Sequence, residues 1–91
     1  MSEMEKLQKW LNENNIKYER HAGGLIIERN QIIVETEEIK LSFICHYGSY
    51  GYEQGLIEMY DFMNEPIGYL TAEDCINKLN EVLLWNIRLR Y

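Results

Sequence analysis

The spacing of apolar residues changes along this sequence, and that change restricts the folds open to the chain more than any other feature. Near the start, apolar residues recur at intervals of three and four, namely Met4, Leu7, Trp10 and Leu11. That spacing gathers side chains on one face of a helix. From Ile16 the pattern alternates as along a strand, and helical spacing returns near the end. Helical patterns that flank alternating ones predict an α+β fold with an antiparallel sheet.

The first predicted helix runs from about Glu3 to Glu13, with Ser2 available as its N-cap. Asn14-Asn15 suits the end of this helix, because asparagine tolerates the left-handed conformation that a C-terminal cap requires. The alternating pattern over residues 16–21 then predicts a first strand, which we expect at an edge of the sheet.

The next apolar segments predict a hairpin and a further strand. Residues 25–28 and 32–35 flank the polar connection 29–31, and Gly23-Gly24 permits a turn before them. A strand over residues 39–45 places its odd-numbered residues in the core. Ile26, Ile33 and Ile44 then fall on the opposite face, so either another element covers that face or it is an interface.

Two helices are predicted in the C-terminal part. Leu56, Ile57, Tyr60 and Met63 follow helical spacing, which predicts a helix from about Tyr52 to Met63, and Asn64-Glu65-Pro66 stops it. Thr71 can cap a last helix, with Glu73 and Asp74 in its first turn. The inward stripe of this last helix consists of Ile76, Leu79, Leu83 and Ile87. Residues 85–91 also alternate, so a terminal strand is an alternative.

At 91 residues the chain has room for one domain only. We therefore predict a single α+β domain over residues 1–91, with a small antiparallel sheet of three or four strands, an N-terminal helix and two C-terminal helices. No stretch reaches the roughly 18 to 20 apolar residues of a membrane span, and the start is not signal-like. We expect a cytoplasmic protein with reduced cysteines and no membrane contact.

The formal net charge of −6 is concentrated in the middle of the chain. Residues 30–77 hold nine acidic residues and one lysine, Lys40. Such a surface repels nucleic-acid phosphate and attracts a basic protein surface. We therefore expect no direct nucleic-acid binding and a protein partner with a basic surface. The simpler alternative is a solvated acidic surface that keeps the protein in solution.

Residues that could support catalysis do not form a recognisable pattern. Cys45 and His46 are adjacent on a predicted strand and so point to opposite faces, which favours a core role for Cys45 over a thiolate paired with a base. The cysteines and histidines match no metal-ligand spacing, and the glycines match no nucleotide-binding fingerprint. We predict a protein that is not an enzyme and has no cofactor or metal; catalysis by Cys45 or His46 is a minor alternative.

The segment 46–55 has the most distinctive composition in the chain. It holds Tyr47, Tyr50 and Tyr52 among three glycines. Tyrosine offers a broad contact surface with a polar tip, and glycine lets the backbone expose it, so the combination favours recognition. Two alternatives remain open: a tight turn whose tyrosines fold over the core, and a helix N-terminus after Gly51 that binds a phosphate-bearing small ligand.

A resemblance accompanies this segment. Residues 44–58, ICHYGSYGYEQGLIE, and residues 68–74, GYLTAED, resemble small uncharacterised proteins of phages and prophages of Gram-positive bacteria. The likeness covers roughly the C-terminal half and transfers no catalytic residues. It implies a short acidic accessory protein in the bacterial host cytoplasm. Such proteins often occupy a host protein, including CRISPR effectors and other defence nucleases, so an anti-CRISPR or similar inhibitor is the leading hypothesis.

Two sets of residues are candidates for binding. The predicted partner-binding residues are Tyr47, Tyr50, Tyr52, Glu53, Glu58 and Asp61. The predicted dimer interface consists of Leu84, Trp85 and Leu89, which add apolar surface outside the inward stripe of the last helix. The alternative function is binding or sequestering of a phosphate-bearing small ligand.

Overall fold

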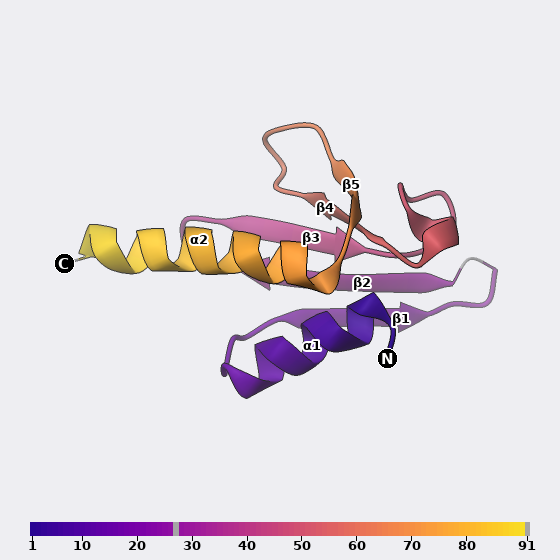
Figure 1. Cartoon of the computed structure of the whole chain (residues 1–91), viewed down its shortest axis with the longest axis horizontal. Coiled ribbons are helices and arrows are strands. Elements are labelled where there is room, and N and C mark those ends of the chain that lie inside the picture. The colour runs from indigo at the N-terminus through magenta and orange to yellow at the C-terminus, as the bar shows by residue number, and fades with distance from the viewer. Residues whose placement is uncertain (27, 91) are drawn as a thin grey trace.

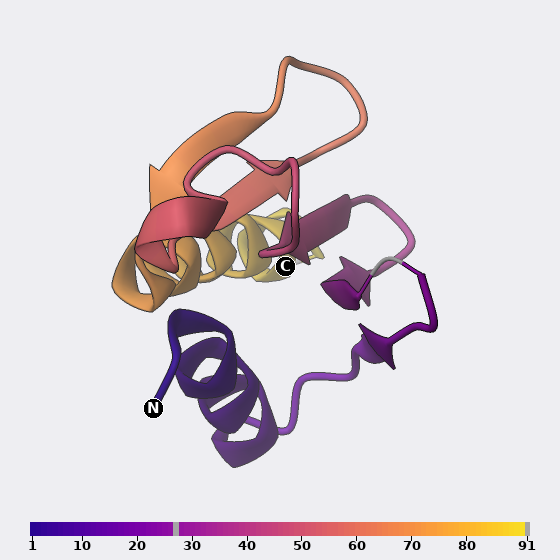
Figure 2. The ribbon, with the colours of Figure 1, turned by 90° about the vertical axis from the view of Figure 1, so that its right-hand side faces the viewer.

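The computed structural model describes the backbone of residues 1–26 and 28–90 and the side chains of residues 1–26 and 28–83. In chain order, the elements are α1 (Glu3–Glu13), β1 (Glu19–Gly23), β2 (Arg29–Glu35), β3 (Lys40–Ile44), the 3₁₀ helix η1 (Tyr52–Gln54), β4 (Ile57–Tyr60), β5 (Ile67–Leu70) and α2 (Ala72–Arg90). Over the described part, five antiparallel strands form one sheet in the order β1-β2-β3-β4-β5 (Figure 1). Both helices lie on the same side of it (Figure 2). The predicted α+β class is confirmed.

Helix α1 forms as its end signals predict. The Ser2 hydroxyl accepts a hydrogen bond from the Glu5 amide at 3.1 Å, which satisfies one of the free donors of the first turn. Asn14 is the C-cap, and Asn15 follows in the left-handed conformation, with φ of 54°. The predicted bounds, cap and stop are all confirmed.

The core lies between the two helices and the inner face of the sheet. It consists of Met4, Leu7 and Leu11 of α1, of Ile32, Val34, Leu41, Phe43, Ile57 and Met59 of the strands, and of Ala72, Cys75 and Leu79 from α2. Phe43 lies opposite Ile32 on one side and Met59 on the other, so the three central strands share one apolar row. Ile33 and Ile44 follow buried residues of β2 and β3 in the alternation of a strand, so they lie on the opposite face of the sheet, as predicted. Ile26, the third residue predicted there, lies instead in the turn between β1 and β2.

The predicted hairpin of residues 25–28 and 32–35 is wrong. Arg29 begins β2 and pairs with Gly23, so the hairpin joins β1 to β2, and residues 24–26 and 28 lie in the connection between them; Ile27 lies outside the described residues. The polar residues of β2 are tolerated in a strand because their side chains find partners. The Asn30 amide donates to the Cys45 carbonyl at 3.0 Å, and the Gln31 amide donates to the Ser42 hydroxyl at 2.8 Å. Strand β1 is an edge strand, as predicted, but starts only at Glu19.

The predicted helix from Tyr52 to Met63 is also wrong. Only the three-residue η1 forms, and Gly55 ends it in a left-handed conformation with φ of 72°. Beyond it, Ile57 and Met59 are buried while Glu58 and Tyr60 face the other side, which is the period of a strand. The sheet therefore has five strands rather than three or four, and one C-terminal helix replaces the two predicted. Residues 64–66 lie in the connection between β4 and β5.

Helix α2 begins at the predicted cap. The Thr71 hydroxyl accepts from the Asp74 amide at 3.1 Å, and the Asp74 carboxylate accepts from the Thr71 amide at 3.0 Å, which is a reciprocal capping box. The helix continues to Arg90, so the alternative of a terminal strand is wrong for residues 85–90. Leu79 of the predicted stripe is buried, and Ile76 and Leu83 are partly buried. The side chains of Ile87 and of the predicted dimer residues Leu84, Trp85 and Leu89 lie outside the described part of the chain.

Candidate functional site

The tyrosine segment 46–55 is a loop with its own internal hydrogen bonds. Ser49 closes its first turn: its hydroxyl donates to the His46 carbonyl at 2.7 Å and accepts from the His46 amide at 3.1 Å. A second turn follows, in which the amides of Gly55 and Leu56 donate to the carbonyls of Tyr52 and Gly51, each at 2.9 Å. These bonds hold the backbone that carries the tyrosines in one shape.

The loop is also anchored to the sheet. The Glu58 carboxylate on β4 accepts a hydrogen bond from the Tyr50 amide at 2.7 Å, and the Tyr50 carbonyl accepts from the Tyr69 amide of β5 at 3.3 Å. The approach between loop and strand is close: a Cβ atom added to Gly68 would lie 2.2 Å from the Cβ of Tyr50. One added to Gly51 would lie 3.0 Å from the Cα of Tyr69. Glycine is required at these contacts because a side chain would push the loop off β5.

The anchored loop presents an aromatic hollow at the end of the sheet. A cavity of about 390 Å³, called here the tyrosine cavity, is lined by Tyr47, Gly48, Ser49, Tyr50, Gly51, Tyr52, Glu53, Gln54 and Tyr69. The tyrosine side chains remain well exposed, from 41% for Tyr52 to 82% for Tyr47. They therefore do not fold over the core, which was the simpler interpretation of the segment. The rings of Tyr47 and Tyr52 meet edge to face, with centroids 6.3 Å apart and planes at 78°.

Sequence reasoning missed Tyr69. It adopts a left-handed conformation with φ of 59°, which is uncommon for a bulky residue and is held here by the hydrogen bond to Tyr50. The only mark of it in the sequence is a second Gly-Tyr pair, Gly68-Tyr69, which repeats the composition of Gly51-Tyr52.

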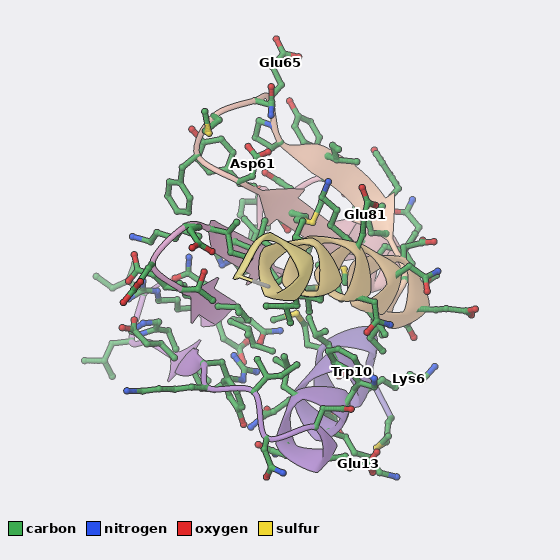
Figure 3. The ribbon with its side chains drawn as sticks, turned by 90° about the vertical axis from the view of Figure 1, so that its left-hand side faces the viewer. Lys6, Trp10, Glu13, Asp61, Glu65 and Glu81 are labelled. Carbon is green, nitrogen blue, oxygen red and sulfur yellow. The ribbon has the colours of Figure 1, made fainter. Side chains whose placement is uncertain are left out.

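The structure brings together five of the six predicted partner-binding residues and separates Asp61 from them. Asp61 follows the far end of β4, at the start of the connection that carries Glu65 at its outer end (Figure 3). Its carboxylate accepts from the amides of Asn64 at 2.8 Å and Met63 at 3.0 Å and from the Asn64 side chain at 2.9 Å. These donors, the Asn64 amide first, lower the pKa of Asp61 to about 2. Asp61 therefore orders a turn and is remote from the tyrosine cavity.

A second exposed apolar group lies at the same end of the molecule. Leu25 and Ile26, in the turn between β1 and β2, are almost completely exposed, and Figure 1 shows this turn at the end of the sheet where η1 lies. An open groove of about 470 Å³ shares Tyr47, Tyr52 and Glu53 with the tyrosine cavity and is lined also by Glu28, which follows this turn; Leu25 and Ile26 do not line it. Sequence reasoning missed this group because it assigned both residues to a strand. Exposed apolar side chains gathered in one place are typical of an interaction surface.

The thiols of the protein have raised pKa values. Burial raises the pKa of Cys45, and burial together with the nearby Asp74 and Glu3 carboxylates raises that of Cys75 to about 12. Both thiols are thus protonated and weakly nucleophilic at neutral pH. The Nδ1 atom of His46 is buried and has no hydrogen-bond partner among the described residues, so no bond from it to Cys45 is formed. Within that part of the chain no three histidine, cysteine or acidic residues are grouped to hold a metal ion.

The helix whose N-terminus the phosphate-binding alternative invoked does not form. The helix N-terminus expected after Gly51 is a three-residue 3₁₀ turn. Six backbone amides over residues 49–56 are used within the protein: those of Ser49, Tyr52, Gln54, Gly55 and Leu56 donate to loop carbonyls, and that of Tyr50 donates to Glu58. The cavity lining also includes the Glu53 carboxylate and no lysine, arginine or histidine, which disfavours a phosphate.

The chain was compared with protein families, curated sequences and solved structures. Neither a protein-family model, nor a curated protein sequence, nor a solved structure matches the chain. Of the helices in the described residues, none combines the length and apolar character needed to cross a membrane. The function is therefore inferred from the geometry of the site.

Proposed function

We propose that this protein is a non-enzymatic accessory protein that binds a host protein through the end of the sheet that carries the tyrosine cavity. The observation that supports this most is a loop that is internally hydrogen-bonded, anchored to β4 and β5, and yet presents its tyrosines to solvent. A residue that only fills space is normally buried. Tyrosines on a fixed backbone lose little conformational entropy on contact, which is why they are enriched at binding surfaces.

Charge indicates what kind of partner fits this surface. Glu28 and Glu53 flank the groove beside the tyrosines, and the chain carries a net charge of −6. Acidic groups around an apolar centre steer a basic surface toward it and repel nucleic acid. Nucleic-acid-binding proteins must have such basic surfaces. Together with the resemblance to phage and prophage proteins, this supports a defence nuclease of the bacterial host, such as a CRISPR effector, as the partner that is bound and inhibited.

The proposal is tested with two variants in a pull-down from lysate of a Gram-positive host. One variant combines Tyr47→Ser, Tyr50→Ser and Tyr52→Ser. The matched control combines Met63→Ser and Glu65→Gln in the exposed connection after β4, at the opposite end of that strand. We expect the wild type and the control to retain the same nucleic-acid-binding protein at low salt and to release it as salt is raised. Equal capture by the triple-tyrosine variant would contradict the proposed surface.

The inhibitory step is tested separately with the captured protein. Purified nuclease is assayed for cleavage of its nucleic acid with increasing amounts of the wild type, the tyrosine variant and the control. We expect inhibition that saturates near stoichiometric amounts for the wild type and the control only. Undiminished cleavage by a nuclease that is fully bound would leave a binding protein without inhibitory activity and would refute the second half of the proposal.

A further inference from the structure

We infer that the tyrosine cavity binds a single arginine side chain of the protein partner; this inference rests on the proposed function and specifies the chemistry of its central contact. At about 390 Å³ the cavity lies at the small end of the range of ligand pockets, which leaves room for one side chain. Four tyrosines line it, and Glu53 is the one charged residue among the nine that do so. Aromatic walls with a single carboxylate are suited to a cation.

The arrangement of the rings favours a planar cation. The rings of Tyr47 and Tyr52 meet at 78°, so the edge of one covers one face of the other, and a cation in the cavity stacks on a ring face outside that contact. The face of an aromatic ring carries partial negative charge, and a cation within about 6 Å of its centre is attracted to it. A guanidinium group can stack on such a face and still donate two parallel hydrogen bonds to a carboxylate such as Glu53. Lysine, a compact and strongly hydrated cation, cannot do both.

The cavity is formed before any ligand arrives. Tyr69 is held with φ of 59°, a conformation that costs a bulky residue free energy and persists only where the surroundings enforce it. Two contacts enforce it: the hydrogen bond from the Tyr69 amide to the Tyr50 carbonyl, and the close packing of Gly51 on the Tyr69 backbone. A fixed lining lowers the entropy that binding must overcome. Strained residues of this kind are characteristic of binding sites.

The test uses ¹⁵N-labelled protein titrated with Nα-acetyl-arginine amide and followed by NMR. The matched control ligand is Nα-acetyl-citrulline amide, which has nearly the same shape and no charge. We expect saturable shifts confined to residues 47–54 and 69 with the arginine compound and none that saturate with citrulline. Glu53→Gln should weaken the arginine compound about two- to fivefold, as for an exposed ion pair. Glu65→Gln, in the connection after β4, should leave its affinity unchanged.

Other outcomes would overturn the inference. Equal shifts from citrulline, tighter binding of the lysine analogue, or no localised shifts with a well-dispersed wild-type spectrum would each exclude an arginine site. A Tyr52→Leu variant that keeps its spectrum and its full affinity for the arginine compound would do the same. Failure here is distinguishable from failure of the proposed function: a partner captured by the wild type while arginine gives no shifts would leave the function standing and remove this contact.

Discussion

Gly68 shows how one missing side chain positions the candidate site. Its φ is not in the left-handed region, so the residue is not required for its backbone conformation. It is required for space, because Tyr50 lies directly against its Cα atom. Gly48 is the opposite case: it has a φ of 91° and nothing near the position of a Cβ atom. Substitutions of these two glycines therefore distinguish the effect of lost space, at Gly68, from the effect of backbone strain, at Gly48.

The first prediction compares Gly68→Ala with Gly48→Ala. We expect Gly68→Ala to lower the free energy of unfolding by about 1–3 kcal/mol, because the new methyl group overlaps Tyr50. Gly48→Ala should cost about 1–2 kcal/mol through strain alone and leave the contact with β5 intact. Urea denaturation measures the stability, and amide shifts of Tyr50 and Tyr69 report the contact. Unchanged shifts of both amides in Gly68→Ala would show that the loop is not anchored there.

Single residues that act on the backbone within a few positions of themselves were predictable from the sequence. Ser2, Asn15 and Thr71 do at the helix ends what their chemistry indicates, because caps depend on neighbours three or four positions away. Tyr69 was not predictable, since its conformation is enforced by Tyr50, nineteen positions earlier in the chain. The candidate site thus depends on tertiary contacts that local patterns do not contain.

At the scale of elements, a single carboxylate ties the two helices together. The Glu3 side chain of α1 accepts a hydrogen bond from the Ala72 amide at 2.8 Å, at the start of α2. It also forms an ion pair with Lys6 at 2.8 Å. The α2 N-terminus is therefore capped from another element as well as by Thr71, and its partial positive charge is offset.

The second prediction is that Glu3→Ala lowers the free energy of unfolding by about 1 kcal/mol at pH 7. Lys6→Ala, which removes the ion pair alone, should cost about 0.2–0.5 kcal/mol. Glu5→Ala in the same turn is the control for the effect of an acid near the helix start, and should cost less than Glu3→Ala. Thermal and urea unfolding of the four proteins would measure this. Equal losses in Glu3→Ala and Glu5→Ala would show that the bond to Ala72 contributes nothing.

The same bond has a defined pH dependence. The Lys6 ammonium first, and then the Ala72 amide, hold the pKa of Glu3 below its ordinary value of 4.5. A carboxylate whose pKa is lowered by folding stabilises the protein above its unfolded pKa, and this contribution is lost as the pH falls through the folded value. The difference in stability between the wild type and Glu3→Ala should therefore be constant above about pH 5 and shrink below pH 4.5. A difference that grows in acid would have the wrong sign.

Helices and strands were predicted correctly where the spacing of apolar residues fits only one of the two, and wrongly where it fits both. Helix α1 and the start of α2 have end signals that agree with their spacing, and both were predicted. In residues 56–63 the spacing of Leu56, Ile57 and Tyr60 fits a helix, while Ile57 and Met59 fit a strand. The sheet decides between them, because β3 offers a partner edge to which these residues pair and Gly55 has already ended the helical turn. Tertiary pairing of this kind overrides local preference.

At the scale of the whole molecule, Cys75 lies where both layers meet. It is completely buried on α2 against the core of the sheet, and its pKa is raised to about 12. Reaching its sulfur requires the helices to separate from the sheet. It is therefore a probe of global opening, whereas Cys45 is only partly buried at the end of β3.

The third prediction concerns thiol modification of a Cys45→Ser variant at pH 8. We expect Cys75 to react with a maleimide about a thousandfold more slowly, or slower still, in the native protein than in concentrated guanidinium, because it reacts only from opened molecules. Mass spectrometry after quenching measures the rate, and the Cys75→Ser variant provides the contrast, since its partly buried Cys45 should react sooner. Native Cys75 that reacts within tenfold of the denatured rate would contradict the described core.

The order of the sheet has a consequence for synthesis. Each strand pairs with its neighbour in the chain, so every hairpin can form as soon as its second strand has left the ribosome. The helices are different: the apolar face of α1 and the Glu3 carboxylate emerge first, yet their partners at Ala72 and Leu79 are made after the last strand. A nascent chain therefore lacks the α2 side of the core that covers α1 until α2 is translated. Termination directly before Thr71 would release all five strands without α2, and so without the core residues Ala72, Cys75 and Leu79.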